Sequence, residues 1–192
     1  MAEHYRLRYC CAMASGMKYR DIVREIALDQ YGLISTKQAV EAGVPAVELP
    51  KLAARGGLVN VSYGLYRVTD IPPTVYDEFA EALMRVGDEA FLFGESVLAF
   101  FRLADVNPQR IRVATPRRNR AKLPAFIDLV HAKDDVRTVY YEGLKAQRVA
   151  DAIVECRGRV TADRLLEAVK EAVRDGLLTV PEANRIRREI RA

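Results

Sequence analysis

The chain has 192 residues, of which half are hydrophobic and 29% are charged, and its net charge is +4. This composition is typical of a globular protein that buries a core. No segment approaches the roughly 20 apolar residues that cross a bilayer, and the first residues lack the apolar run of a signal peptide. Three cysteines make no disulfide framework. We therefore expect a cytoplasmic protein with free thiols and no membrane partner.

Basic residues are concentrated in two segments. Residues 1–67 hold nine Lys or Arg and six Asp or Glu, whereas residues 106–127 hold six basic residues and no acid. Basic patches on a nearly neutral chain favour a polyanionic partner. The alternative interpretation is a set of solvated loops, since composition alone is only an indication.

The predicted elements begin with a flexible N-terminal tail over residues 1–17. Residues 18–31 repeat apolar side chains at helical spacing, namely Ile22, Val23, Ile26 and Ala27. This spacing predicts an amphipathic helix, which the following glycine ends.

Two short helices are expected next. Ser35 is followed three residues later by Gln38, which is a capping-box pattern, and Gly43 marks the end of that helix. A third helix is predicted over residues 47–55. Pro50 is compatible with it because the first four N–H groups of a helix have no partner within the helix.

A β-hairpin is predicted after these helices. Two β-rich runs, 58–61 and 65–68, flank the short turn Ser62-Tyr63-Gly64. Helix, short capped helix, short helix and hairpin is the order of a winged helix-turn-helix, which we predict over residues 18–70. The prolines that follow Asp70-Ile71 indicate a linker.

Residues 74–192 are predicted to form a second, mixed α/β domain that ends in helices. The patterns indicate helices at 74–86, 95–104, 145–156, 162–174 and 181–190, and β-like runs at 110–114, 126–131 and 136–141. The expected fold class of the whole chain is therefore α+β.

In a helix-turn-helix, the second helix of the pair lies in the major groove and the first crosses the backbone. The candidate DNA-binding residues are Ser35, Thr36 and Lys37 on the first helix, Lys51 and Arg55 on the reading helix, and Asn60, Ser62, Tyr63 and Arg67 on the hairpin. A possible second surface, for nucleic acid or a toxin, consists of Arg117, Arg118, Arg120 and Lys122. The alternative for this surface is a solvated loop between two strands, and some winged helices bind proteins instead of DNA.

No pattern in the sequence indicates an enzyme. A metal-dependent nuclease needs a Glu-x-Lys or Asp-x-Lys step, and none occurs. There is no phosphate-binding P-loop, and the histidines have no metal-ligand spacing. We expect no catalytic residue, no metal and no cofactor, and we interpret His131 as structural.

The N-terminal residues resemble the AbiEi-type antitoxins of type IV toxin–antitoxin systems. The matching stretches are 32–44 (GLISTKQAVEAGV), 52–59 (LAARGGLV) and 64–68 (GLYRV), with looser likeness at 93–103 and 142–153. The resemblance implies an antitoxin domain over 74–192 that neutralises a co-encoded nucleotidyltransferase-like toxin. It also implies a repressor that binds promoter DNA of its own operon. The alternative is a winged-helix regulator whose second domain senses a small ligand.

Overall fold

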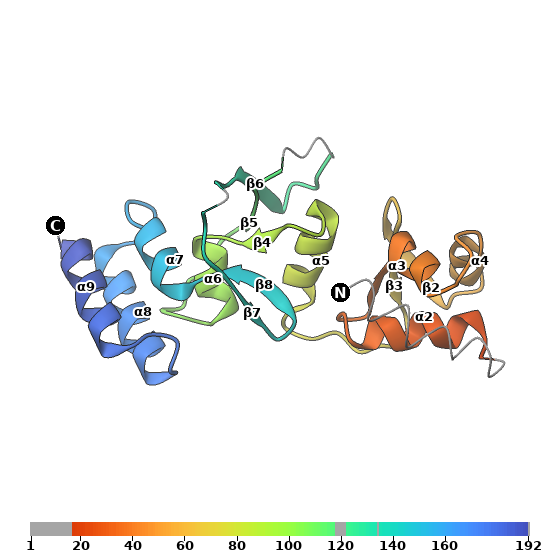
Figure 1. The fold of residues 1–192 in the computed structure, drawn as a ribbon, viewed down its shortest axis with the longest axis horizontal. Helices are drawn as coiled ribbons and strands as arrows, with labels where there is room; N and C mark the ends of the chain where they lie inside the picture. Colours follow the sequence, from red (N-terminus) through yellow and green to blue (C-terminus); the bar gives the residue numbers. More distant parts are fainter. Residues whose placement is uncertain (1–16, 118–121, 134, 192) are drawn as a thin grey trace. The chain divides into compact units, whose positions relative to one another are not determined.

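The computed structural model describes residues 17–117, 122–133 and 135–191, so the expected N-terminal tail lies almost entirely outside the described residues. Eight helices and two β-sheets occur over these ranges (Figure 1). The expected mixed α+β class is thus confirmed. No helix in the described part of the chain has the length and apolar character needed to cross a membrane. The chain divides into two compact units after Arg85.

The first unit contains four helices and a three-stranded sheet. Its elements are α2 (Tyr19–Leu28), β1 (Leu33–Ser35), α3 (Thr36–Glu41), α4 (Glu48–Ala54), β2 (Leu58–Ser62), β3 (Leu65–Val68) and α5 (Asp77–Val86). The strands lie in the order β1-β3-β2, and both pairs are antiparallel.

The core of this unit is built from the residues that the apolar spacing identified. Ile22 and Ile26 of α2 are fully buried in one cluster with Ile34 of β1, Leu49 of α4 and Val68 of β3. The predicted capping box of α3 is also present. Local sequence signals therefore specify most of this unit.

The turn of the β2–β3 hairpin is held against the start of α3. The amide and hydroxyl of Thr36 both donate to the carbonyl oxygen of Gly64, at 2.7 and 3.2 Å. Gly64 has a φ of +70°, a conformation that glycine adopts without steric cost. These hydrogen bonds fix the turn relative to α3, although the two residues are 28 positions apart in the sequence.

Helix α5 is joined to the hairpin by two polar contacts. The Asp77 carboxylate forms an ion pair with Arg67 of β3, and Arg85 Nη2 donates to the carbonyl oxygen of Val61 at 2.7 Å. We expected the second domain to begin at residue 74, before this helix. The division after Arg85 places α5 with the first unit instead, in agreement with these contacts.

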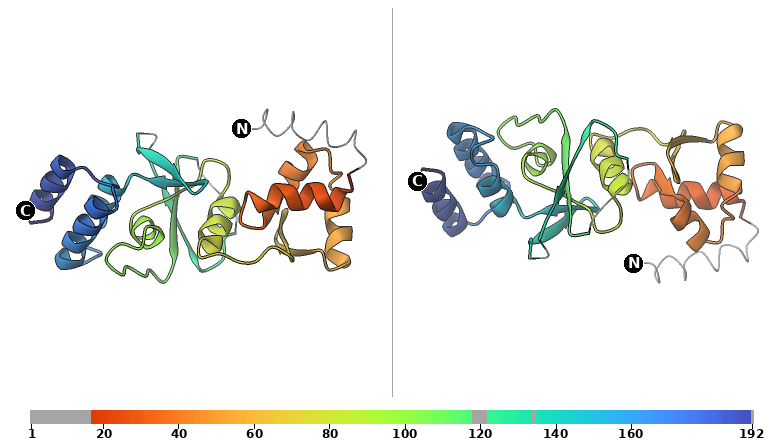
Figure 2. Two further views of the ribbon diagram at one scale, coloured as in Figure 1. Left: turned by 90° about the horizontal axis from the view of Figure 1, so that it is seen from below. Right: turned by 90° about the horizontal axis from the view of Figure 1, so that it is seen from above.

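The second unit contains a mixed five-stranded sheet and four helices. Its elements are β4 (Phe91–Leu92), α6 (Glu95–Phe100), β5 (Ile111–Thr115), β6 (Ile127–His131), β7 (Thr138–Tyr141), β8 (Leu144–Gln147), α7 (Val149–Glu155), α8 (Ala162–Arg174) and α9 (Val180–Arg191). The strand order is β6-β5-β4-β8-β7, with parallel pairs β5–β6 and β4–β8. Helices α8 and α9 pack side by side at the C-terminal end (Figure 2).

One predicted helix begins too early. We expected a helix over 145–156, but residues 144–147 form strand β8, and α7 begins at Val149. The cause is the two-residue turn Glu142-Gly143, where both residues have positive φ, +49° and +76°. Such turns match the twist of paired strands, so β7 continues into β8 as a hairpin. The predicted 95–104 helix also ends earlier, at Phe100, before the left-handed Arg102.

The carboxylate of Asp77 is expected to stabilise the first unit. Burial favours a higher pKa for Asp77, but hydrogen bonds from Thr74 and Arg67 outweigh it and hold this pKa below the ordinary 3.8. Asp77→Asn should lower the free energy of unfolding at pH 7 by about 1–3 kcal/mol. Because the folded-state pKa is lowered, this contribution is present above pH 4 and is lost as the pH falls through the folded pKa. Denaturant titrations at pH 7 and pH 3 measure both effects.

Asp70→Asn is the matched control. Asp70 pairs with Arg24 at 2.8 Å, but both side chains are largely exposed. An exposed pair contributes less than about 1 kcal/mol, so this variant should unfold almost like the wild type. Equal losses for the two variants would show that the Arg67–Asp77 pair has no special role.

Candidate functional site

The two hydroxyl groups at the start of α3 that we predicted to contact DNA form hydrogen bonds within the protein. Ser35 Oγ accepts from the amide of Gln38 at 3.2 Å, and it lies 2.9 Å from Gln38 Oε1, to which it donates. The Thr36 hydroxyl donates to Gly64. Lys37, in contrast, is exposed. Of these three residues, Lys37 alone presents a charged group on the surface, and the two hydroxyls position the helix.

Helix α4 presents one lysine and several apolar residues. Lys51 is exposed, with its Nζ 2.8 Å from a Glu48 carboxylate oxygen. Val47 is 63% exposed, and Pro50 is exposed as well. Arg55 follows the last turn of α4 and is also exposed. The outer face of this helix is therefore less basic than the positions of Lys51 and Arg55 in the sequence indicated.

The hairpin residues differ in their accessibility. Tyr63 is fully exposed at the turn and Asn60 is exposed on β2, whereas Ser62 is half-buried. Arg67 is only 25% exposed and is held by Asp77. Tyr63 and Asn60 are thus accessible on the surface, whereas Arg67 forms an ion pair with Asp77 within the unit.

The basic stretch of the second unit is only partly described. The exposed Arg117 pairs with Glu89 at 2.7 Å, and Lys122 is exposed. Arg118 and Arg120 lie outside the described residues. Of the described members of this predicted surface, Arg117 is therefore already paired with an acidic side chain.

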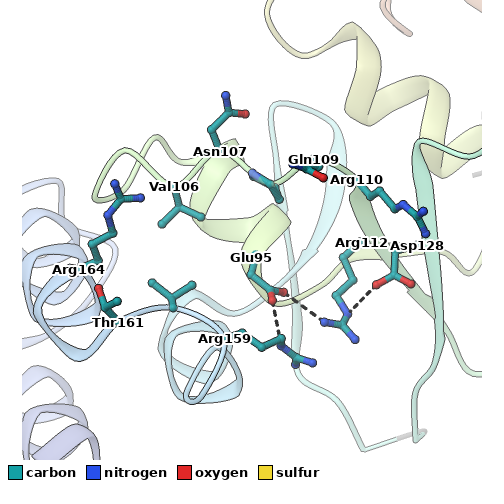
Figure 3. Close-up of a pocket in the computed structure, with 12 residues that line it drawn as sticks. Glu95, Val106, Asn107, Gln109, Arg110, Arg112, Asp128, Arg159, Thr161 and Arg164 are labelled. Carbon is teal, nitrogen blue, oxygen red and sulfur yellow. Dashed lines mark hydrogen bonds and ion pairs between the residues drawn. The ribbon is translucent and has the colours of Figure 1, made fainter.

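A different basic site lies on the second unit, which the sequence analysis did not identify. It is a cavity of about 750 Å³, which we call the arginine cavity (Figure 3). Its lining residues are Glu95, Val106, Asn107, Pro108, Gln109, Arg110, Arg112, Asp128, Arg159, Val160, Thr161 and Arg164. They come from α6, the α6–β5 loop, β5, β6, the α7–α8 loop and α8, so no single sequence segment contains the site.

Glu95 organises the centre of the arginine cavity. One carboxylate oxygen lies 3.4 Å from Arg112 Nη1, and the other lies 2.9 Å from Arg159 Nε. The parallel register of β5 and β6 places Arg112 opposite Asp128, and their ion pair measures 3.3 Å. The atom of Arg112 in this ion pair is Nε, which is buried and does not form a hydrogen bond with the Asp128 oxygen. Two guanidinium groups are thus held in place beside a shared carboxylate.

The position of Glu95 depends on the turn that precedes α6. Gly94 has φ +55° and ψ −123°, and its amide donates to the buried Gln147 side chain at 3.1 Å. The hydroxyl of the buried Ser96 accepts from the amide of Arg112 at 2.6 Å. These contacts join the start of α6 to β5 and β8, and they bring Glu95 and Arg112 together.

No protein-family model and no curated protein matches the sequence. Among solved structures, the fold is similar to the crystal structure of the RV2827C protein from Mycobacterium tuberculosis. The TM-score is 0.47 and the sequence identity is 17%, and the match covers 86% of this chain and 69% of that chain. A likeness this distant gives no information on function.

Chemistry at this site is limited by its residue types. Among the described residues, no group of three or more His, Cys, Asp or Glu side chains is placed to hold a metal ion. Cys156 lies behind Gly94 and is fully buried. Its burial and the nearby charge of Glu95 raise the pKa of this thiol to about 12. Arginine and carboxylate groups therefore dominate what the cavity offers to a ligand.

The buried thiol gives a test of this environment. In a Cys10→Ser/Cys11→Ser background, Cys156 should react with an aromatic disulfide reagent at pH 8 far more slowly in the folded protein than in guanidinium. The reason is that the thiolate is the reactive form, and a thiol with a pKa of about 12 is almost entirely protonated at this pH. Thiol release followed by absorbance measures both rates. Fast reaction in the folded state would contradict the burial of Cys156.

Proposed function

We propose that residues 18–70 are a winged helix-turn-helix that binds DNA. The observation that carries this proposal is the helix pair α3–α4 followed by a hairpin whose turn is tied to the first helix of the pair. The β1-β3-β2 sheet supports it, because the two hairpin strands and the strand before α3 form one antiparallel sheet. In this arrangement α4 is the helix offered to the major groove.

The proposed contacts follow from which polar groups are exposed. Lys37, Lys51 and Arg55 supply positive charge around the helix pair, and Asn60 and Tyr63 supply polar groups on the hairpin. Lys51 is exposed and its ion pair with the half-buried Glu48 lies at the surface, where such pairs contribute little, so a DNA phosphate or base edge can replace it. Ser35, Thr36 and Arg67 are assigned to positioning these elements.

We further propose that the chain is the antitoxin and autorepressor of a toxin–antitoxin pair. The resemblance of residues 32–68 to AbiEi-type antitoxins supports this assignment. The division of the chain into two compact units supports a separation of tasks, with DNA binding in the first unit and toxin neutralisation in the second. The neutralised protein would be a nucleotidyltransferase-like toxin encoded beside this gene.

The DNA-binding proposal predicts specific, salt-sensitive binding to the promoter upstream of the gene. Lys51→Ala and Arg55→Ala should each weaken this binding, by about 1–3 kcal/mol where the side chain contacts a base. Fluorescence anisotropy with promoter DNA and a scrambled duplex, at several salt concentrations, measures affinity and its salt dependence.

Lys170→Ala is the matched control, because Lys170 on α8 is exposed and pairs with Glu167 three residues earlier, as Lys51 does with Glu48. It should bind promoter DNA like the wild type. The assignment of α4 to the groove would be wrong if the Lys51 and Arg55 variants also retained wild-type affinity. Equal affinity for promoter and scrambled DNA would reject autorepression.

The antitoxin proposal predicts rescue of growth. Co-expression of the full chain should restore growth to cells that express the neighbouring toxin, and the Lys51→Ala/Arg55→Ala variant should rescue equally well. The reason is that these residues are assigned to DNA binding alone. Colony counts with the toxin under a separate inducible promoter provide the measurement. Absence of rescue by the wild-type chain at matched expression would refute the antitoxin role.

A further inference from the structure

We propose that the arginine cavity binds a phosphorylated small molecule of nucleotide size that carries more than one phosphate group. The cavity is lined by four arginines and two carboxylates, which leaves an excess of two positive charges in one recess. Like charges gathered in this way repel each other, and a bound polyanion relieves that repulsion. The inference depends neither on DNA binding by the first unit nor on antitoxin activity.

Two of the four arginines have no partner that explains their position. Among the residues that the structure describes, the guanidinium groups of Arg110 and Arg164 have no hydrogen-bond or ion-pair partner. Arg164 lies in the first turn of α8, where the helix dipole disfavours positive charge. Arg164 therefore does not stabilise its own helix, and its guanidinium is available to an anion in the cavity.

The other two arginines are already oriented. Glu95 holds the guanidinium groups of both Arg112 and Arg159. A guanidinium has five N–H donors in a planar fork. Arg112 also pairs with Asp128 through Nε, and Arg159 Nη2 also donates to the carboxylate and the carbonyl oxygen of Glu155, so the contacts within the protein use Nε and Nη1 of Arg112 and Nε and Nη2 of Arg159. The remaining terminal nitrogens, Nη2 of Arg112 and Nη1 of Arg159, can each donate to a phosphate oxygen in a charge-assisted hydrogen bond. Because these side chains are fixed before the ligand arrives, binding costs little conformational entropy.

The distribution of charge favours a ligand with more than one phosphate. Arg164 and Thr161 lie at one end of the cavity, and Arg110, Arg112 and Asp128 lie at the other, with Glu95 and Arg159 between them (Figure 3). The Thr161 hydroxyl makes no capping bond with its own helix. We therefore expect a ligand with several phosphates to contact the arginines of this cavity better than a single phosphate does.

The rest of the lining suits the organic part of a nucleotide. A volume of about 750 Å³ is within the usual range for small-molecule sites. Val106 and Val160 provide apolar surface, and the amides of Asn107 and Gln109 provide donors and acceptors for a base or a sugar. Recognition of this kind combines a few directed polar groups with apolar contact.

A single-stranded nucleic acid fits the cavity less well. Sites for single strands combine a basic groove with aromatic side chains that stack on the bases. None of the residues that line the arginine cavity is aromatic. Glu95 and Asp128 would also oppose a continuous phosphate backbone, whereas a compact ligand can place its phosphates beside the arginines alone.

The test measures binding of inorganic phosphate, pyrophosphate, AMP, ATP, GTP and a single-stranded oligonucleotide to the full chain by isothermal titration calorimetry. We expect one site per chain, with affinity rising from phosphate to the triphosphates and falling with added salt. Arg110→Ala and Arg164→Ala should each weaken triphosphate binding roughly tenfold, since each removes a charge-assisted contact. Both side chains are exposed and unpaired, so these variants should fold normally.

Arg174→Ala is the control, because Arg174 lies at the opposite end of the same helix and is exposed. It should leave nucleotide affinity unchanged, and circular dichroism should show that all variants are folded. The proposal is overturned if no phosphate compound binds at millimolar concentration, or if the Arg110 and Arg164 variants bind as tightly as the wild type. It is equally overturned if only an oligonucleotide, and no mononucleotide, depends on these arginines.

Discussion

The turn over Phe93–Glu95 is the constraint on which the second unit depends. Two buried polar side chains converge on it from different directions. Gln147 of β8 accepts from the amide of Gly94, and Ser96 accepts from the amide of Arg112 on β5. Buried polar groups that lack a partner are costly, so these bonds favour one arrangement of helix and strands. The fixed backbone then determines where the side chains of Glu95 and Arg112 lie.

The charged residues of the chain divide into those that hold the fold together and those that remain on the surface. Arg67 and Arg85 contact groups within the first unit, and Arg112 is held between Glu95 and Asp128. Lys51 and Arg55 are exposed. A net charge of +4 does not distinguish these classes, because the same residue type serves structure in one place and is accessible to a ligand in another.

Much of the first unit could be predicted because its signals are local. The apolar spacing of α2, the capping box of Ser35 and Gln38, and the turn at Tyr63-Gly64 each lie within a few residues of the element that they specify. The ion pair of Arg67 could not be predicted, since its partner belongs to a helix that the sequence assigned to another domain. Accessibility depends on such distant contacts.

The arginine cavity could not be predicted either, because it too depends on contacts between residues that are far apart in the sequence. The sequence showed Arg110, Arg112 and Arg117 as one basic run, but in the fold Arg117 is separated from the other two, which both line the cavity. Arg112 faces Glu95 and Asp128, whereas Arg117 pairs with Glu89. Arg159 and Arg164 join the site from a loop and a helix more than forty residues later. Strand β8 was mistaken for helix because the turn before it, not its own composition, determines its pairing.

The backbone at Gly94 has a consequence for how related sequences should be interpreted. Its φ of +55° with ψ of −123° is a combination that side chains with a Cβ avoid. A Cβ at this position would lie 3.7 Å from the Arg112 side chain and 3.9 Å from Cys156 Sγ, which are ordinary van der Waals distances, so the backbone conformation and not a lack of space disfavours a side chain here. Among homologues, this glycine should therefore be invariant for reasons of conformation alone. Its conservation would mark the place where the arginine cavity is assembled, although the glycine itself would contact no ligand.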